Sequence, residues 1–242
     1  MSLDVAVAEL ADHLLKQEFV EVLAHHDADG IAAASILCHA MYRKGMQFRL
    51  RIRPVITTAD VPRDSSVLLC DFGSALPDLS SDVMVVDHHM PHFEGEYHVN
   101  PRLEGIDGDR NLSAAGAAYL VAQRMGDNRD LAGLALLGIL GDGQEIEGPN
   151  REIVNEGIAN GFITPNRGLR LAGRGLVEQL ALALNPYLDG LSGTPETART
   201  LVAQVTDEDD VDYETLLSRI VLATAPRSEE HTSELQSRSD LV

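Results

Sequence analysis

The chain has 242 residues, and its 38 acidic residues against 19 lysines and arginines give a formal net charge of −19. Hydrophobic residues make up 44% of it, so it can bury a core, but it has no apolar run long enough to span a membrane. The charge disfavours non-specific binding to nucleic acid at ordinary salt, because lysine and arginine supply that affinity.

Two further features of the composition point to the cell compartment. Cys38 and Cys70 both sit in apolar runs, so we expect reduced core residues of a cytoplasmic protein and not a disulfide scaffold. Lysine occurs only at Lys16 and Lys44. An acidic surface with little lysine is typical of proteins from a salt-saturated, halophilic cytoplasm, where the short Debye length screens self-repulsion.

The hydrophobic pattern alternates between helices and strands along the chain. Helices are predicted over residues 4–18, 31–45, 113–125, 129–140, 150–160 and 173–184. Strands are predicted over residues 19–24, 47–53, 65–73 and 81–89. The last two strands are short, continuous apolar runs that end on an acid, which is typical of parallel strands buried on both faces. We therefore expect an α/β fold with an open, mainly parallel sheet and helices on both faces.

Acids and histidines follow three of these strands. The first strand runs into HHDADG, which supplies His25, Asp27 and Asp29; a later strand ends at Asp71, and the next at Asp87, His88 and His89. Ligands of open α/β sheets bind beyond the carboxyl ends of the strands. If the strands are parallel neighbours, the three clusters therefore meet at one edge of the sheet. His92 and His98 lie just past the last cluster and are expected in solvated loops.

The first cluster has two interpretations. Alternate residues of an extended segment point to the same side, so His25, Asp27 and Asp29 can face one site together. Alternatively, Asp29 caps a helix that begins near Ile31. A cap accounts for one acid, but it does not account for two acids and a histidine at this spacing.

Taken together with Asp142, which follows a glycine-rich helix end, the clusters contain histidines and aspartates without a cysteine. Such ligands suit Mn²⁺, Fe²⁺, Zn²⁺ or Co²⁺. The set is large enough to hold two divalent ions with a shared carboxylate, and a site of that kind activates a water and stabilises a leaving oxygen. The natural substrate of such a site is a phosphate ester or anhydride.

Four motifs now indicate a family. HHDADG, CDFG, VVDHHMP and GILGDG occur in this order, and together they resemble the motifs of the DHH phosphoesterase superfamily over residues 20–185. That superfamily includes RecJ exonucleases, oligonucleotide and cyclic-dinucleotide phosphodiesterases and manganese pyrophosphatases. The segments 148–174 and 180–199 resemble its archaeal RecJ-like branch in particular.

The resemblance implies a role for each residue of the clusters. The first metal ion would be held by His25, Asp27 and Asp71, and the second by Asp29, Asp71, His88 and Asp142. As catalytic residues, His89 would contact the scissile phosphate and Asp87 would orient its neighbours. The two ions are expected to be manganese, with magnesium or cobalt as alternatives.

The resemblance also implies an activity. We expect a metal-dependent phosphodiesterase, a RecJ-like exonuclease that uses a two-metal-activated water on single-stranded DNA or RNA. One alternative is a phosphodiesterase for short oligonucleotides or cyclic dinucleotides. Another is a non-catalytic scaffold among replication-complex proteins. No membrane partner is expected.

The predicted organisation has three parts. Residues 1–185 form the catalytic domain, and residues 186–226 lead as a connector toward a C-terminal substrate-binding domain whose glycine-rich motif is absent from this sequence. Residues 227–242 lack periodicity and back-translate to a common sequencing-adapter sequence, so we interpret them as adapter read-through. The alternative for that stretch is a disordered tail.

Overall fold

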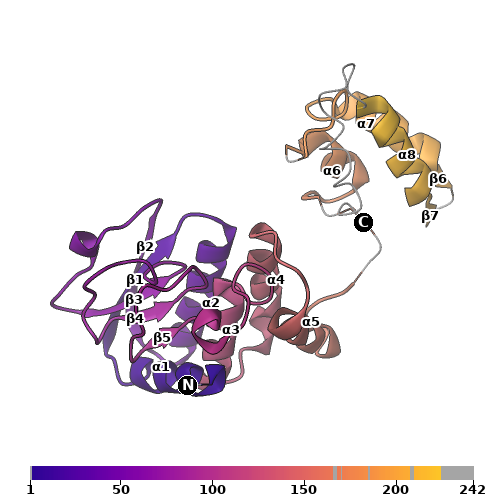
Figure 1. The fold of residues 1–242 in the computed structure, drawn as a ribbon. Helices are drawn as coiled ribbons and strands as arrows, with labels where there is room; N and C mark the ends of the chain where they lie inside the picture. The colour runs from indigo at the N-terminus through magenta and orange to yellow at the C-terminus, as the bar shows by residue number, and fades with distance from the viewer. Residues whose placement is uncertain (1, 166–167, 170, 185, 208–209, 225–242) are drawn as a thin grey trace. The chain divides into compact units, whose positions relative to one another are not determined.

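A computed structural model describes residues 2–165, 168–169, 171–184, 186–207 and 210–224 (Figure 1). The chain divides into two units, Met1–Thr164 and Pro165–Val242, and each is described here by itself. The predicted tail, residues 227–242, lies outside the described residues. No helix within the described ranges is long and apolar enough to cross a membrane.

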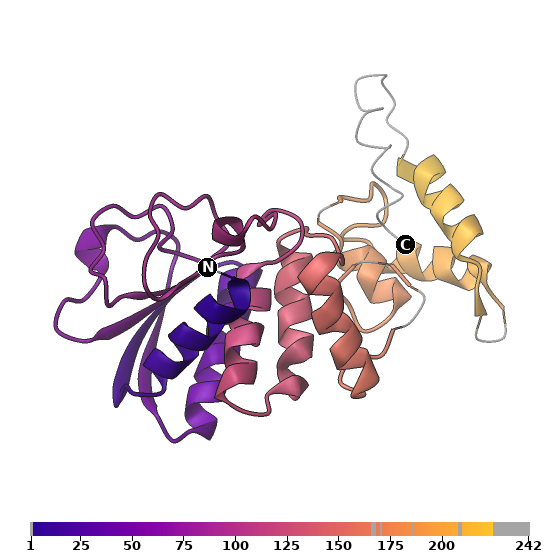
Figure 2. The same ribbon diagram turned by 60° about the horizontal axis from the view of Figure 1, so that its bottom comes forward.

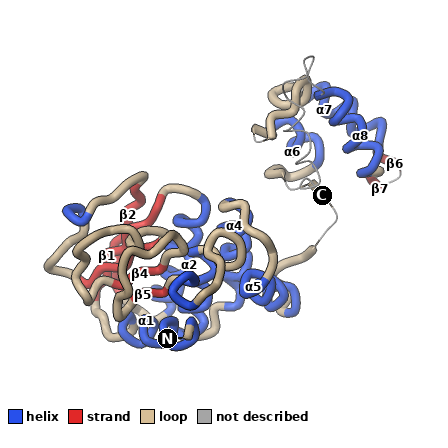
Figure 3. Tube along the Cα trace, viewed as in Figure 1, coloured by secondary structure: helices blue, strands red, loops and turns tan. Residues whose placement is uncertain are grey.

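The first unit is built on a five-stranded parallel sheet, drawn in red in Figure 3. The strand order is β2-β1-β3-β4-β5. The strands are β1 Phe19–His25, β2 Gln47–Arg53, β3 Ser66–Cys70, β4 Met84–Val86 and β5 His98–Val99. In register, Cys70 of β3 pairs with Ala24 of β1 and Val86 of β4. The three central strands therefore end side by side, as the predicted parallel arrangement requires.

Five helices of the described residues stand side by side in Figure 2; the first three along the chain pack against one face of the sheet, and the last two pack against the helices of that layer. They are α1 Leu3–Leu14, α2 Ala28–Arg43, α3 Ala114–Met125, α4 Ala132–Gly141 and α5 Gly148–Ala159, and three short 3-10 helices accompany them, η1 Thr58–Asp60, η2 Pro101–Glu104 and η3 Arg129–Leu131. α2 and α3 are rich in alanine, so they approach each other closely and bury their small side chains with strand residues such as Val22 and Val86 in one core. Cys38 and Cys70 lie in this core as free, buried thiols, as predicted.

The opposite face of the sheet carries a second, smaller core. Leu23, Leu69 and Val85 point to that side, where Ile56 and Val61 from the loops around η1 cover them. The predicted α/β fold with a mainly parallel sheet is confirmed, but the prediction of helices on both faces is wrong for the described residues of this unit. Loops take the place of helices there, because an apolar strand must be covered but does not specify what covers it.

The second unit has its own core. It contains α6 Leu176–Leu182, α7 Pro195–Val205, β6 Thr206–Asp207, β7 Asp210–Val211 and α8 Tyr213–Thr224. The unit begins at Pro165, whereas the sequence pattern suggested a boundary at residue 185. The structure divides the chain earlier because Leu180 and Ala181 of α6 pack with Leu188 and Leu191 in the core of this unit.

Candidate metal centre

The sheet brings the predicted clusters to one edge. His25 is the last residue of β1, Asp71 directly follows β3, and Asp87 directly follows β4. Since these strands are parallel neighbours, their carboxyl ends lie together. Asp142 arrives at the same edge as the residue that follows α4.

The first group of candidate ligands consists of His25, Asp27 and Asp71, whose ligand atoms lie within 4.8 Å of one another. Nδ1 of His25 lies 2.7 Å from Oδ2 of Asp27 and 3.2 Å from Oδ2 of Asp71. Gly30 makes this approach possible, because a Cβ at that position would lie 2.7 Å from the His25 carbonyl oxygen. The glycine of HHDADG therefore lets the first turn of α2 close onto the end of β1.

The cap of α2 differs from the alternative considered for Asp29. The helix begins at Ala28, and Asp27 is its N-cap, accepting a hydrogen bond from the Gly30 amide at 2.9 Å. Oδ1 of Asp27 makes this bond, and Oδ2 faces His25. The cap and the candidate ligand are therefore the same residue, because each oxygen of Asp27 serves a different partner.

Asp29 reaches across to the start of α3 instead. Its two carboxylate oxygens accept hydrogen bonds from the amides of Ala114 and Ala115, at 2.7 and 2.9 Å. Free amides at a helix N-terminus favour a negative charge. Gly138 of α4 lies against this carboxylate, since a Cβ there would be 2.5 Å from Oδ1 of Asp29. The glycine that opens GILGDG thus leaves room for the Asp29 side chain.

The second group consists of Asp29, His88 and Asp142. Nε2 of His88 lies 3.4 Å from Oδ2 of Asp142 and 3.8 Å from Oδ2 of Asp29. The other ring nitrogen, Nδ1, donates to the carbonyl oxygen of Gly108 at 2.6 Å. Because the Gly108 carbonyl accepts the proton of Nδ1, Nε2 is the ring nitrogen that is left to act as a metal ligand.

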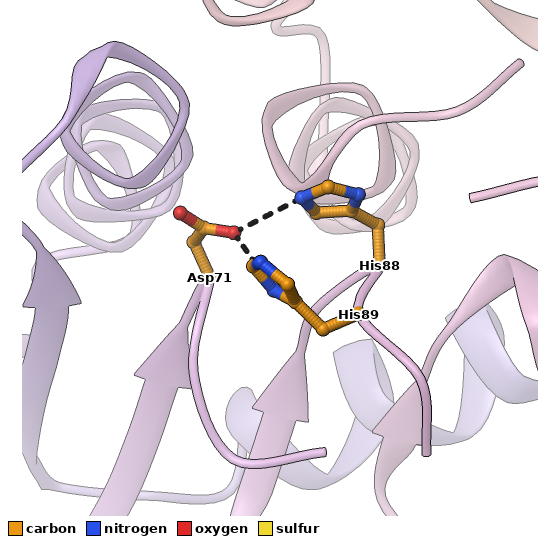
Figure 4. Close-up of side chains that lie close together, drawn as sticks. All are labelled: Asp71, His88 and His89. Carbon is orange, nitrogen blue, oxygen red and sulfur yellow. Dashed lines mark ion pairs between the residues drawn. The ribbon is translucent and has the colours of Figure 1, made fainter. Parts of the chain in front are cut away.

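Asp71 joins the two groups. Its Oδ2 faces His25, while its Oδ1 lies 3.3 Å from Nε2 of His88 and 3.6 Å from Nδ1 of His89. Figure 4 shows this oxygen facing both imidazole rings. Asp71 has a left-handed backbone with φ of 58° and is only 2% exposed. Aspartate tolerates this conformation better than most residues do, and here it turns the side chain into the site.

Asp87 and His89 form a separate pair beside these groups. Oδ1 of Asp87 accepts a hydrogen bond from Nδ1 of His89 at 2.8 Å, and Oδ2 accepts one from the Ser74 amide at 2.9 Å. Asp87 is buried, but the His89 side chain is 55% exposed. The pair therefore fixes one edge of the His89 ring and leaves Nε2 available to a bound molecule.

A buried polar network that the sequence analysis missed supports this pair. The Ser74 hydroxyl lies 2.9 Å from Nε2 of His98, and the Asn100 amide donates to that hydroxyl and to the carbonyl oxygen of His89. The expectation of a loop position for His98 is wrong, because it lies in β5 and is buried. Burial lowers the pKa of His98 to about 4, so the ring is neutral. His92 is exposed in a loop, as expected.

The electrostatics of the site favour a cation. Burial raises the pKa of Asp29 to about 7, with repulsion from Asp71 adding to the effect. Burial also raises the pKa of Asp71. Although burial opposes it, contact with Asp71 and Asp29 raises the pKa of His88 to about 10. Crowded acids of this kind are stabilised by a proton or by a metal ion.

The donor set fits divalent metal ions. Oδ1 of Asp71 and Nε2 of His88 are buried and make no hydrogen bond to any described residue, so both are open to a metal ion. The groups supply carboxylate and imidazole ligands with no thiolate, which suits Mn²⁺ and similar ions. Two candidate ligands lie on the His25 side of Asp71 and three on the His88 side, which matches the arrangement of a two-metal site with a shared carboxylate.

Comparison with known proteins finds a family that part of the chain matches. Residues 20–139 match the DHH family, N-terminal domain. An uncharacterized protein of Methanocaldococcus jannaschii is 26% identical over 230 residues, which cover 84% of this chain and 53% of that protein. The chain thus spans about half the length of this curated relative.

Two solved structures are similar in fold. The crystal structure of exonuclease RecJ bound to manganese aligns with a TM-score of 0.52 and 19% identity, covering 98% of this chain and 63% of that one. The crystal structure of CDC45 from Entamoeba histolytica aligns with a TM-score of 0.57 and 13% identity, covering 99% of this chain and 59% of that one. At these identities the likeness concerns the fold alone.

Proposed function

The chain belongs to the DHH superfamily of phosphoesterases, and we propose that its site binds two divalent cations and hydrolyses phosphodiester bonds. The observation that supports this most is the position of Asp71 between two groups of ligands. Its two oxygens face different partners, His25 on one side and His88 on the other. A carboxylate shared in this way is what a two-metal hydrolase requires.

We assign the ligands as the motifs suggest. One ion would be held by His25, Asp27 and Asp71, and the other by Asp29, Asp71, His88 and Asp142. Bound divalent ions lower the pKa of water and neutralise charge that develops on a phosphate. We propose manganese as the ion, with magnesium or cobalt as alternatives, since this ligand set accepts each of them.

The protein's own residues bind and orient the phosphate. The hydrogen bond to Asp87 raises the pKa of His89, which favours the protonated ring, and the exposed edge of the ring can donate to a phosphate oxygen. Asp87 keeps its charge because hydrogen bonds from His89 and Ser74 lower its pKa despite burial. Together they place a hydrogen-bond donor beside the ligand groups, where charge develops during attack on phosphorus.

As substrate we propose single-stranded DNA or RNA, attacked from an end as by an exonuclease. The relative resolved with manganese is an exonuclease RecJ, which supports this choice at the level of the fold. Short oligonucleotides or cyclic dinucleotides are the alternative. The contacts proposed for this site are to the phosphate group alone, and both kinds of substrate contain it. No described residue is assigned to the selection between a polymer and a small substrate.

A non-catalytic scaffold among replication proteins is the second candidate. The complete set of candidate ligands argues against it, because a scaffold without catalysis does not need six ligands at one edge of a sheet.

The halophilic origin and the cytoplasmic location suggested by the composition remain predictions. The predicted halophilic origin is the reason to assay the chain at high salt concentration.

The proposal is tested with labelled single-stranded DNA, single-stranded RNA and a cyclic dinucleotide, each incubated with the chain and Mn²⁺ in high salt. We expect cleavage of the single strands that stops in EDTA and returns with added Mn²⁺. Cleavage of the dinucleotide alone would favour the small-substrate alternative. No cleavage of any substrate, or cleavage that persists in EDTA, would contradict a metal-dependent phosphodiesterase.

A further inference from the structure

A buried glutamine lies behind the second group of ligands. Gln144 follows α4 closely and is only 4% exposed. Its Nε2 lies 2.8 Å from the carbonyl oxygen of Gly108 and 3.3 Å from Oδ2 of Asp142. A primary amide nitrogen carries two protons, so it can donate to both acceptors at once. One side chain therefore contacts a candidate ligand and the backbone that holds another.

The Gly108 carbonyl is the acceptor that orients His88. It accepts from Nδ1 of His88 at 2.6 Å and from Gln144, and these two nitrogens lie 3.4 Å apart because they share one oxygen. The backbone at Gly108 is pressed against His88, since a Cβ there would lie 2.3 Å from the His88 carbonyl oxygen. A displaced Gly108 would therefore move or rotate the His88 ring.

Asn150 sets the orientation of the Gln144 amide. It is fully buried at the start of α5, and its Nδ2 donates to Oε1 of Gln144 at 3.0 Å and to the carbonyl oxygen of Glu145 at 3.1 Å. Because Oε1 of Gln144 is held by a donor, its nitrogen must face Gly108 and Asp142. Asn150 thus orients Gln144, which contacts Asp142 directly and His88 through the Gly108 carbonyl.

We propose that Gln144 is a positioning residue, oriented by Asn150, that fixes His88 and Asp142 in the geometry needed to bind the second metal ion. This inference rests on the proposed metal centre and extends it. Among the described residues, no hydrogen bond or ion pair joins Gln144 to the first group, His25, Asp27 and Asp71. Loss of the Gln144 amide should therefore lower the affinity for the second metal ion and leave the affinity for the first unchanged.

The test is Mn²⁺ binding by isothermal titration calorimetry to the wild-type chain and to Gln144→Met, which keeps the volume and removes the amide. We expect two sites in the wild type and a 10- to 100-fold loss of affinity at one of them in the variant, as is typical when a partner of a ligand is removed. If Gln144→Met does not fold, Gln144→Glu replaces it, because a carboxylate cannot donate to Gly108 or Asp142.

Two further variants separate positioning from general damage. Gln123→Met is the matched control, because Gln123 is a half-buried glutamine near the end of α3 whose Nε2 lacks a hydrogen bond to the described residues. It should leave both affinities unchanged. If Asn150 acts through Gln144, Asn150→Leu combined with Gln144→Met should weaken the site no more than Gln144→Met alone.

The outcomes distinguish the two proposals. Two Mn²⁺ sites in the wild type with unchanged affinities in Gln144→Met would overturn the role of Gln144 and leave the metal centre intact. Equal weakening of both sites would also overturn it, because that indicates general destabilisation. Absence of Mn²⁺ binding by the folded wild type would overturn the metal centre itself, and the role of Gln144 with it.

Discussion

Nε2 of His88 lies 3.3 Å from Oδ1 of Asp71, although the two residues follow different strands of the sheet. Both atoms are buried, and neither makes a hydrogen bond within the described part of the chain. Two buried ligand atoms that face each other without a hydrogen bond are what a site prepared for a bound ion would present. This contact is the centre of the metal-site proposal.

Gly138 should be sensitive to a single added methyl group. In Gly138→Ala the new Cβ would lie 2.4 Å from the Cβ of Ala115 and 2.5 Å from Oδ1 of Asp29. Overpacking of this kind lowers the free energy of unfolding by about 1–3 kcal/mol, and it should also weaken Mn²⁺ binding because Asp29 is displaced. Thermal unfolding and a metal titration measure the two effects.

Gly133 on the same helix provides the matched control. A Cβ there meets nothing within 4 Å, so Gly133→Ala should raise helix stability by about 0.5–1 kcal/mol and leave Mn²⁺ affinity unchanged. If both alanine variants behave alike, the close approach of α4 to Asp29 is not what makes Gly138 necessary.

His89 should matter for hydrolysis more than for metal binding. Its Nδ1 is held by Asp87 at 2.8 Å, so the ring is better placed to contact phosphate than to serve as a ligand. His89→Ala should lower kcat for phosphodiester cleavage about 100- to 1000-fold, while both Mn²⁺ affinities stay close to wild type. Loss of an ion in this variant would show that His89 belongs to the ligands, as its proximity to Asp71 and His88 allows.

Mn²⁺ affinity should rise with pH. The metal-free protein holds protons on Asp29, whose pKa burial raises to about 7, and on His88, whose pKa its acidic neighbours raise to about 10. Ligands must lose such protons to bind a metal ion, so higher pH removes a competitor. Between about pH 6 and 8 we expect roughly a tenfold gain in affinity per pH unit for each proton released.

Calorimetry in buffers of different ionisation enthalpy measures this proton release directly. The apparent binding enthalpy should depend on the buffer, with at least one proton released per chain near neutral pH. An affinity that is constant or falls over this range would mean that the two groups are already deprotonated before the ion binds.

Much of the site could be predicted because it depends on a regular feature of parallel sheets. Apolar runs that end in His25, Asp71 and Asp87 indicate strands, and parallel strands place their carboxyl ends together. The dual role of Asp27 was harder to foresee. A cap and a ligand look like competing interpretations in a sequence, although one carboxylate has an oxygen for each.

The parts that were not predicted depend on contacts between distant segments. His98 lies in a strand of only two residues, too short for an alternating pattern to reveal. Gln144 sits in a polar stretch typical of a surface turn and Asn150 at the start of a predicted helix, and only the tertiary fold buries them against each other and Gln144 against Gly108. The loop-covered face of the sheet is unpredictable for the same reason, since its strand residues look alike whatever covers them.

The most direct test of the account is the number of Mn²⁺ ions bound by Asp71→Asn. Asparagine keeps the size of the side chain and tolerates the left-handed backbone at this position, so the change removes little besides the charge. The wild type should bind two ions per chain. Asp71→Asn should lose high-affinity binding at both sites together with phosphodiester cleavage, because the proposed assignment gives this carboxylate to both ions. Retention of two tightly bound ions by the folded variant would contradict a shared role for Asp71.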